Sequence, residues 1–140
     1  MRNWQERYAR LIPVNWDVLP GRTYEERLAW MQRDEPKVKG GDDFIKQLRD
    51  PNFQNKKAPA AGLWILNDFR GLTAMLEALE KEQDLTTALN IAEPILFLSF
   101  EAADVHFHKI LKKPNVTPNA KRAIEIILKK SNLLEEPEEV

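Results

Sequence analysis

The sequence predicts an all-α fold with five to seven helices, and three observations support this. Apolar residues recur at spacings of three and four over most of the second half of the chain, which is the period of a helix. Threonine and aspartate stand where several such runs begin, as helix N-caps do. No Asn-Gly or Asp-Gly pair marks a two-residue β-hairpin. We therefore expect short, proline-punctuated N-terminal helices packed on a C-terminal antiparallel helical bundle.

The chain has 140 residues, which is the size of one domain and enough to bury a hydrophobic core without covalent cross-links. We expect a single helical domain over residues 1–134 and a disordered acidic tail over residues 135–140. No cysteine is present, which excludes disulfides and cysteine-ligated metal sites. The N-terminus has no apolar signal core, and the longest apolar run is far too short to span a bilayer. We therefore expect a soluble, cytoplasmic protein that does not enter a membrane.

The N-terminal part is predicted to form short helices that prolines separate. Residues 3–11 read as an amphipathic helix, which Pro13 ends. Thr23 is a suitable N-cap, and Glu26 three residues later completes the pattern of a capping box. A second helix is therefore expected to begin at this point and to end before Pro36.

The middle of the chain is predicted to contain one short helix and one long helix. Asp42 is expected to cap the short helix, which ends before Pro51. Residues 60–83 have leucines and other apolar residues spaced by threes and fours. They therefore read as one continuous helix, which Gly62 and Gly71 weaken locally.

The last third of the chain is predicted to form the core of the bundle. Residues 85–112 are apolar on nearly every side, which is typical of a buried helix. Asp84 is a good N-cap for this helix, and Pro94 is expected to kink it or to split it in two. A last helix is expected to begin with Thr117 as its N-cap and Pro118 at its first position. The large residues expected to face the core are Phe100, Phe107, Ile124, Ile127 and Leu128.

Three polar residues interrupt the long apolar stretch, Glu101, Asp104 and His108, and helical spacing places them on one face. Two carboxylates and an imidazole can bind a cation, so this file is a candidate metal site. The alternative is a solvent-exposed edge in which Asp104 and His108 pair at i, i+4. A strand over residues 104–108 would also align Asp104, His106 and His108 for a metal, but the unbroken helical period argues against a strand.

The charges are segregated along the chain, although the net charge is only −1. Residues 61–108 carry a net charge of −6, residues 109–134 one of +6 and residues 135–140 one of −4. One interpretation is that the acidic and basic segments are neighbouring helices that complement each other. The other is a basic patch that binds an acidic partner. The patch would consist of Lys109, Lys112, Lys113, Lys121, Arg122, Lys129 and Lys130.

The tryptophan content suggests a second kind of contact. The chain has four tryptophans, of which Trp4, Trp16 and Trp30 lie in the N-terminal half. Tryptophan is enriched among residues that anchor protein interfaces, so these three are candidate anchors for a partner. The alternative is that they cover an otherwise thin core.

No motif in the chain points to catalysis. Neither serine lies in a nucleophile elbow, and no glycine-rich phosphate loop occurs, so we predict no catalytic residue and no cofactor. We expect a protein that acts by protein–protein interaction, as an adaptor, an inhibitor or a small subunit of a complex. One alternative is an accessory nucleic-acid-binding protein that uses the basic C-terminal helices, although a near-neutral net charge disfavours this. A third is a metal-dependent activity at Glu101, Asp104 and His108.

Overall fold

The computed structural model describes residue 21 and residues 23–136, so the helix predicted over residues 3–11 lies outside the described residues. The described part contains seven α-helices, one 3-10 helix and no strand, which confirms the predicted all-α fold. In chain order the elements are α2 (Tyr24–Gln32), α3 (Gly41–Arg49), α4 (Lys57–Leu66), η2 (Phe69–Gly71), α5 (Leu72–Lys81), α6 (Leu85–Leu98), α7 (Phe100–Leu111) and α8 (Pro118–Lys130).

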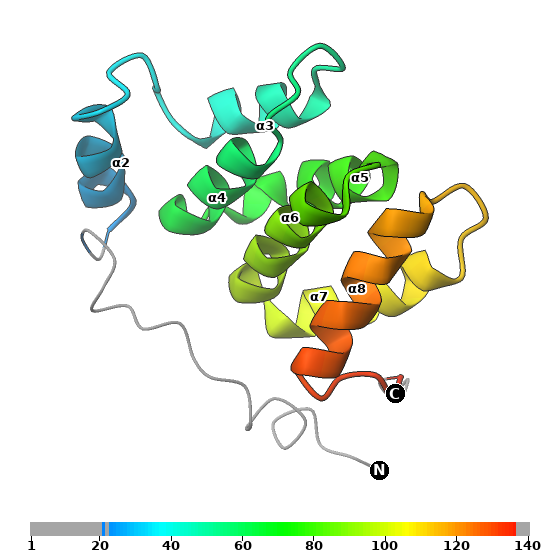
Figure 1. The fold of residues 1–140 in the computed structure, drawn as a ribbon. Helices are drawn as coiled ribbons and strands as arrows, with labels where there is room; N and C mark the ends of the chain where they lie inside the picture. The colour runs from blue at the N-terminus through cyan, green and yellow to red at the C-terminus, as the bar shows by residue number, and fades with distance from the viewer. Residues whose placement is uncertain (1–20, 22, 137–140) are drawn as a thin grey trace.

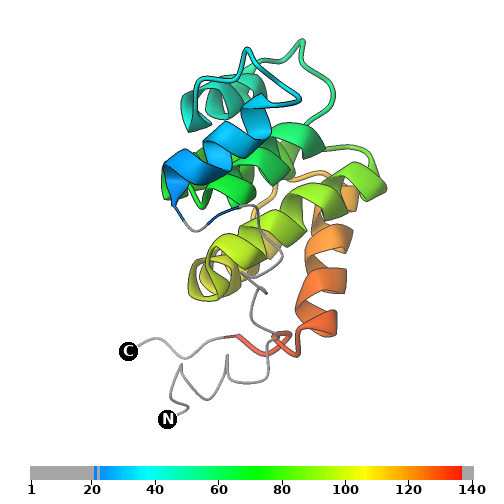
Figure 2. The same ribbon diagram turned by 90° about the vertical axis from the view of Figure 1, so that its left-hand side faces the viewer.

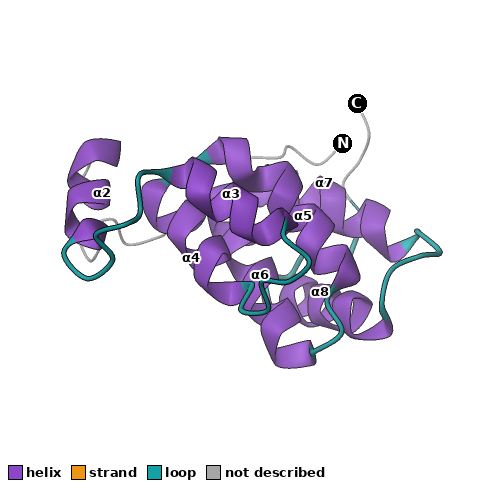
Figure 3. Ribbon diagram, turned by 90° about the horizontal axis from the view of Figure 1, so that it is seen from above, coloured by secondary structure: helices purple, strands orange, loops and turns teal. Residues whose placement is uncertain are grey.

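Helix α6 lies at the centre of the molecule, with α4, α5, α7 and α8 packed around it (Figure 1). Helices α2 and α3 form one end of the molecule, and α7 and α8 lie towards the other (Figure 2). The view from above shows the same separation of α2 from α8 (Figure 3). The N-terminal helices therefore pack on a C-terminal bundle, as the sequence predicts.

Small side chains let the helices approach α6 closely. Ala88, Ile91, Ala92 and Ile95 of α6 have no exposed surface. Alanines on the neighbouring helices are equally buried, and because the distance between two helix axes depends on the side chains between them, these contacts are close. The buried alanines on α4 and α8 are Ala60, Ala120 and Ala123.

Three of the predicted N-caps are confirmed. The side chains of Thr23, Asp84 and Thr117 each accept a hydrogen bond from the backbone N–H three residues later, at 3.1, 2.9 and 3.1 Å. The predicted cap at Asp42 is wrong, because α3 begins one residue earlier, at Gly41. Asp42 instead lies in the first turn of α3, where its negative charge complements the helix dipole.

The prediction of one helix over residues 60–83 is also wrong, because the chain turns at Asn67 between α4 and α5. Asn67 has a left-handed backbone conformation, with φ of 54°. The N–H of the following residue, Asp68, donates to the carbonyl of Leu63 at 2.9 Å, and the N–H of Asn67 donates to that of Trp64 at 2.9 Å. These two bonds form a Schellman motif, which ends a helix and satisfies its last carbonyls.

The long apolar stretch is split in two, as predicted, but at Ser99 and not at Pro94. Pro94 lies inside α6, which continues to Leu98. Ser99 has an extended backbone, and its hydroxyl accepts a hydrogen bond from the N–H of Ala102 at 3.1 Å. The serine therefore caps α7 and sets the turn that brings α7 back against α6.

Hydrogen bonds join the start of α8 to the end of α5 and the loop that follows it. The backbone N–H of Thr117 donates to the carbonyl of Glu80 at 3.1 Å, and the Thr117 hydroxyl donates to the carbonyl of Glu82. The amide of Asn119 donates to the carbonyl of Gln83 at 2.8 Å. The start of α8 is therefore fixed by backbone contacts as well as by its apolar face.

Phe107 and Phe100 differ in burial, which predicts a difference in stability. Phe107 has no exposed surface, whereas Phe100 is only half-buried at the start of α7. We expect Phe107→Ala to lower the free energy of unfolding by about 3–5 kcal/mol, because it removes buried surface and leaves a cavity. Phe100→Ala should cost clearly less. Urea unfolding measures both, and a larger loss for Phe100→Ala would contradict the packing described above.

Candidate functional site

The predicted basic patch is divided between the end of α7 and one face of α8. Lys109 lies in the last turn of α7, and Lys112 and Lys113 follow that helix directly. The other four cations are on α8. All seven are exposed except Lys121, which is half-buried.

The exposed face of α8 carries an apolar residue, Ile126, with three exposed cations and one exposed carboxylate, that of Glu125, beside it. Arg122, Ile126, Lys129 and Lys130 are spaced by four, three and one residues, so they share one face of the helix. Ile126 is 38% exposed, although the residues that follow it in α8, Ile127 and Leu128, are buried. We call the group of Arg122, Ile126, Lys129 and Lys130 the α8 face.

Most of these cations have no ion-pair partner within residues 23–136. Lys113 contacts Glu80 at 2.9 Å, and Lys112 contacts Glu136 at 2.5 Å. No carboxylate of the described chain lies within ion-pair distance of the three cations of the α8 face. The acidic middle segment therefore complements the basic segment at Glu80, but it leaves the α8 face open.

The lysines at the end of α7 affect the pKa of a neighbouring histidine, His106. His106 is half-buried, and burial lowers the pKa of its imidazole below the ordinary value of 6.5. The charges of Lys109 and Lys113 lower it further, because a second positive charge is unfavourable beside them. His106 is therefore a reporter of the electrostatic field of the basic patch.

The polar file on α7 is not a solvent edge, because two of its three residues are buried. Asp104 has no exposed surface and His108 is 7% exposed, whereas Glu101 is exposed. The predicted i, i+4 pair is confirmed, with His108 Nε2 3.3 Å from Asp104 Oδ1. No group of three or more histidine, aspartate or glutamate side chains in the described residues is placed to hold a metal ion. The structure thus does not bring the three predicted ligands together.

His108 instead binds the segment that follows α8. Its Nε2 lies 2.8 Å from the carbonyl oxygen of Leu133, and because a carbonyl oxygen only accepts, Nε2 carries the hydrogen. Asn132 has a left-handed backbone, with φ of 58°, and Leu133 N–H donates to the Leu128 carbonyl at 2.7 Å. This Schellman motif ends α8 and turns residues 131–136 back along α7. We call residues 131–136 the C-terminal strap.

Of the three tryptophans predicted as anchors, only Trp30 is among the described residues. Trp30 on α2 is 44% exposed, while Trp4 and Trp16 lie outside the described residues. Trp64, which was not predicted as a site, packs against Phe97 of α6 in a tilted arrangement, with ring centroids 5.6 Å apart. Its indole N–H is buried and finds no acceptor within the described chain.

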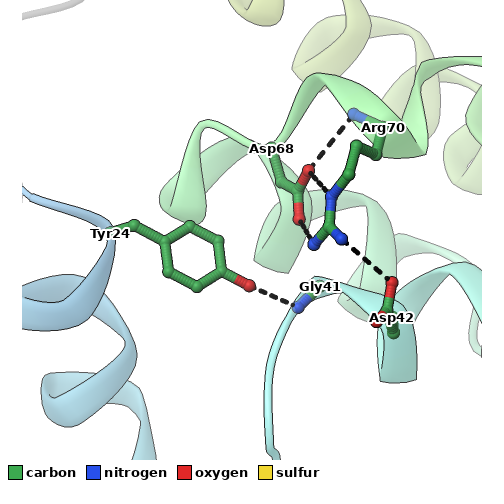
Figure 4. A network of polar contacts seen from close by, with 5 residues as sticks. All are labelled: Tyr24, Gly41, Asp42, Asp68 and Arg70. Carbon is green, nitrogen blue, oxygen red and sulfur yellow. Dashed lines mark hydrogen bonds and ion pairs between the residues drawn. The ribbon is translucent and has the colours of Figure 1, made fainter.

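A second polar cluster, which sequence analysis did not predict, joins η2 to the start of α3 (Figure 4). Arg70 donates two hydrogen bonds to the buried carboxylate of Asp68, at 3.0 and 2.8 Å, and lies 3.4 Å from Asp42. The hydrogen bond from Arg70 lowers the pKa of Asp68. A Cβ on Gly41 would lie 2.0 Å from Asp68 Oδ2, so any side chain at this position would force the Asp68 carboxylate to move. The Tyr24 hydroxyl accepts from Gly41 N–H at 2.8 Å and ties α2 to the cluster.

The cluster is structural in character, because its charged atoms hold η2 together and join it to α3. Both carboxylate oxygens of Asp68 accept from Arg70, and Asp68 also caps η2. A depression beside it on α3, lined by Asp42, Ile45, Lys46, Arg49 and Asp50, is largely open to solvent.

Comparisons with known proteins give no independent assignment. No protein-family model, no curated protein and no solved structure matches the chain. Among the described helices, none combines the length and the hydropathy required to cross a bilayer.

The electrostatic field at the end of α7 predicts the titration of His106. We expect its imidazole to titrate below 6.5 by NMR, and Lys109→Gln to raise this pKa. Below pH 6.5 the unfolded chain binds the proton more readily than the folded chain. The contribution of His106 to stability is therefore complete above pH 6.5 and is lost as the pH falls through the folded pKa. A pKa of His106 above 6.5 would contradict the described surroundings.

Proposed function

We propose that this protein is a non-catalytic binding module that recognises an acidic protein surface through the α8 face. The observation that carries the proposal is the composition of this face, three exposed cations beside an exposed isoleucine, with Glu125 as the single carboxylate of α8 next to them. Three cations without an ion-pair partner in the described chain attract a negatively charged surface. The exposed side chain of Ile126 adds apolar area that a protein partner can cover.

The apolar residue favours a protein partner over a phosphate backbone. Contacts to phosphates are made by cations and hydrogen-bond donors, and affinity for nucleic acid rests largely on counterion release. Protein interfaces combine an apolar centre with a polar rim, which is the arrangement of Ile126 with Arg122, Lys129 and Lys130. The near-neutral net charge of the chain also fits a protein partner better than nucleic acid.

Charge reversal on the α8 face tests the proposal directly. Arg122→Glu with Lys129→Glu should keep the fold, because both side chains are exposed. The double variant should bind poly-L-glutamate at least about tenfold more weakly than the wild type, equivalent to about 1.4 kcal/mol. The matched control is Lys37→Glu with Lys39→Glu, which makes the same charge change in the turn before α3 and should have a much smaller effect.

Two further probes test the apolar contribution of Ile126 to binding and the alternative function, nucleic-acid binding. Ile126→Ser should weaken binding of a random glutamate–leucine copolypeptide and leave poly-L-glutamate binding unchanged. We expect no tight binding of single-stranded or duplex DNA near physiological salt. Submicromolar, salt-sensitive DNA binding that Arg122→Glu with Lys129→Glu removes would overturn the proposal and support a nucleic-acid-binding protein.

A further inference from the structure

The C-terminal strap is held to α7 at two successive points. Leu133 has no exposed surface, and its carbonyl accepts a hydrogen bond from His108. Three residues later, Glu136 pairs with Lys112 at 2.5 Å, one helical turn beyond His108. The strap therefore runs along α7 towards its C-terminal end and places a carboxylate on the basic patch.

The two points of attachment differ in strength. The buried Leu133 and the buried hydrogen bond from His108 hold the start of the strap firmly, because each would leave apolar surface or a polar group unsatisfied if it opened. The side chains of Lys112 and Glu136 are 67% and 55% exposed, and exposed ion pairs are weak and screened by salt. The end of the strap can thus leave Lys112 while its start stays bound.

Glu136 presents to Lys112 the chemistry that an acidic partner would present. Its carboxylate follows an apolar anchor, Leu133, by three residues. Lys112 donates to this carboxylate and lowers its pKa, so the pair is charged at neutral pH. A carboxylate of a bound partner that reached the end of α7 would need the same ammonium group.

We propose that the C-terminal strap is an intramolecular cover that competes with acidic partners for Lys112. This inference rests on the proposed function, because it assumes that an acidic polypeptide bound to the α8 face also extends to Lys112 at the end of α7. Lys112 would be released from Glu136 when such a polypeptide binds. The strap then lowers the affinity of the free protein for weakly acidic surfaces and favours partners with enough carboxylates to displace it.

Binding of poly-L-glutamate by the full chain tests the competition. Glu136→Gln should raise the affinity about 1.5- to 5-fold, the range that loss of an exposed ion pair produces. The matched control is Glu35→Gln, which removes the same charge in the turn after α2, at the opposite end of the molecule, and should leave the affinity unchanged.

A double-mutant cycle separates competition from simple charge repulsion. In a Lys112→Met background, Glu136→Gln should no longer raise the affinity, because the group for which the strap competes is gone. If Glu136→Gln raises the affinity equally with and without Lys112, the proposed cover is wrong. The increase would then come from loss of the repulsion between Glu136 and the polyanion. Equal affinity of the wild type and Glu136→Gln would also overturn the cover. If neither protein binds poly-L-glutamate at low salt, the proposed function fails, and the cover fails with it.

Discussion

The structure depends on the packing of four helices against α6, which leaves exposed only the face of Thr86, Asn90 and Glu93. Helices α4, α5, α7 and α8 all pack on it, so its side chains must fill several interfaces at once. Ala88 and Ala92 keep neighbouring helices close, while Ile91 and Ile95 fill the space between them. Because native cores are close-packed, a larger side chain at either alanine would displace a whole helix. The orientation of α7 and α8, and with it the position of the basic patch, follows from this packing.

The helices could be predicted from the sequence. Helix ends that are not marked by glycine or proline could not. The period of apolar residues and the caps Thr23, Asp84 and Thr117 are local signals, and they located helix starts correctly. Asn67 ends α4 in a left-handed conformation that the apolar period of residues 60–83 conceals. Ser99 caps α7 in the middle of an apolar run, where Pro94 was the more conspicuous signal. Both breaks are set by tertiary packing combined with a short polar side chain.

The candidate site was predictable in its charge but not in its contacts. Segregation of lysines along the sequence predicts the basic patch, since charge is a property of composition. Two ion pairs of the patch join residues distant in sequence, Glu80 with Lys113 and Glu136 with Lys112. They depend on the arrangement of the helices, which the sequence alone does not give. The burial of Asp104 and His108 was equally hidden, because a polar file on one helix face reads as solvent-exposed until the strap that covers it is known.

Native-state hydrogen exchange tests the central role of α6 most directly. If α6 is the common core, its amides at residues 91–93 and 95–98 should exchange only by global unfolding and should be the slowest in the described chain. The amides of α2, which lies at the end of the molecule, should exchange through smaller openings of lower free energy. Amides of α6 that exchange as fast as those of α2 would contradict the account.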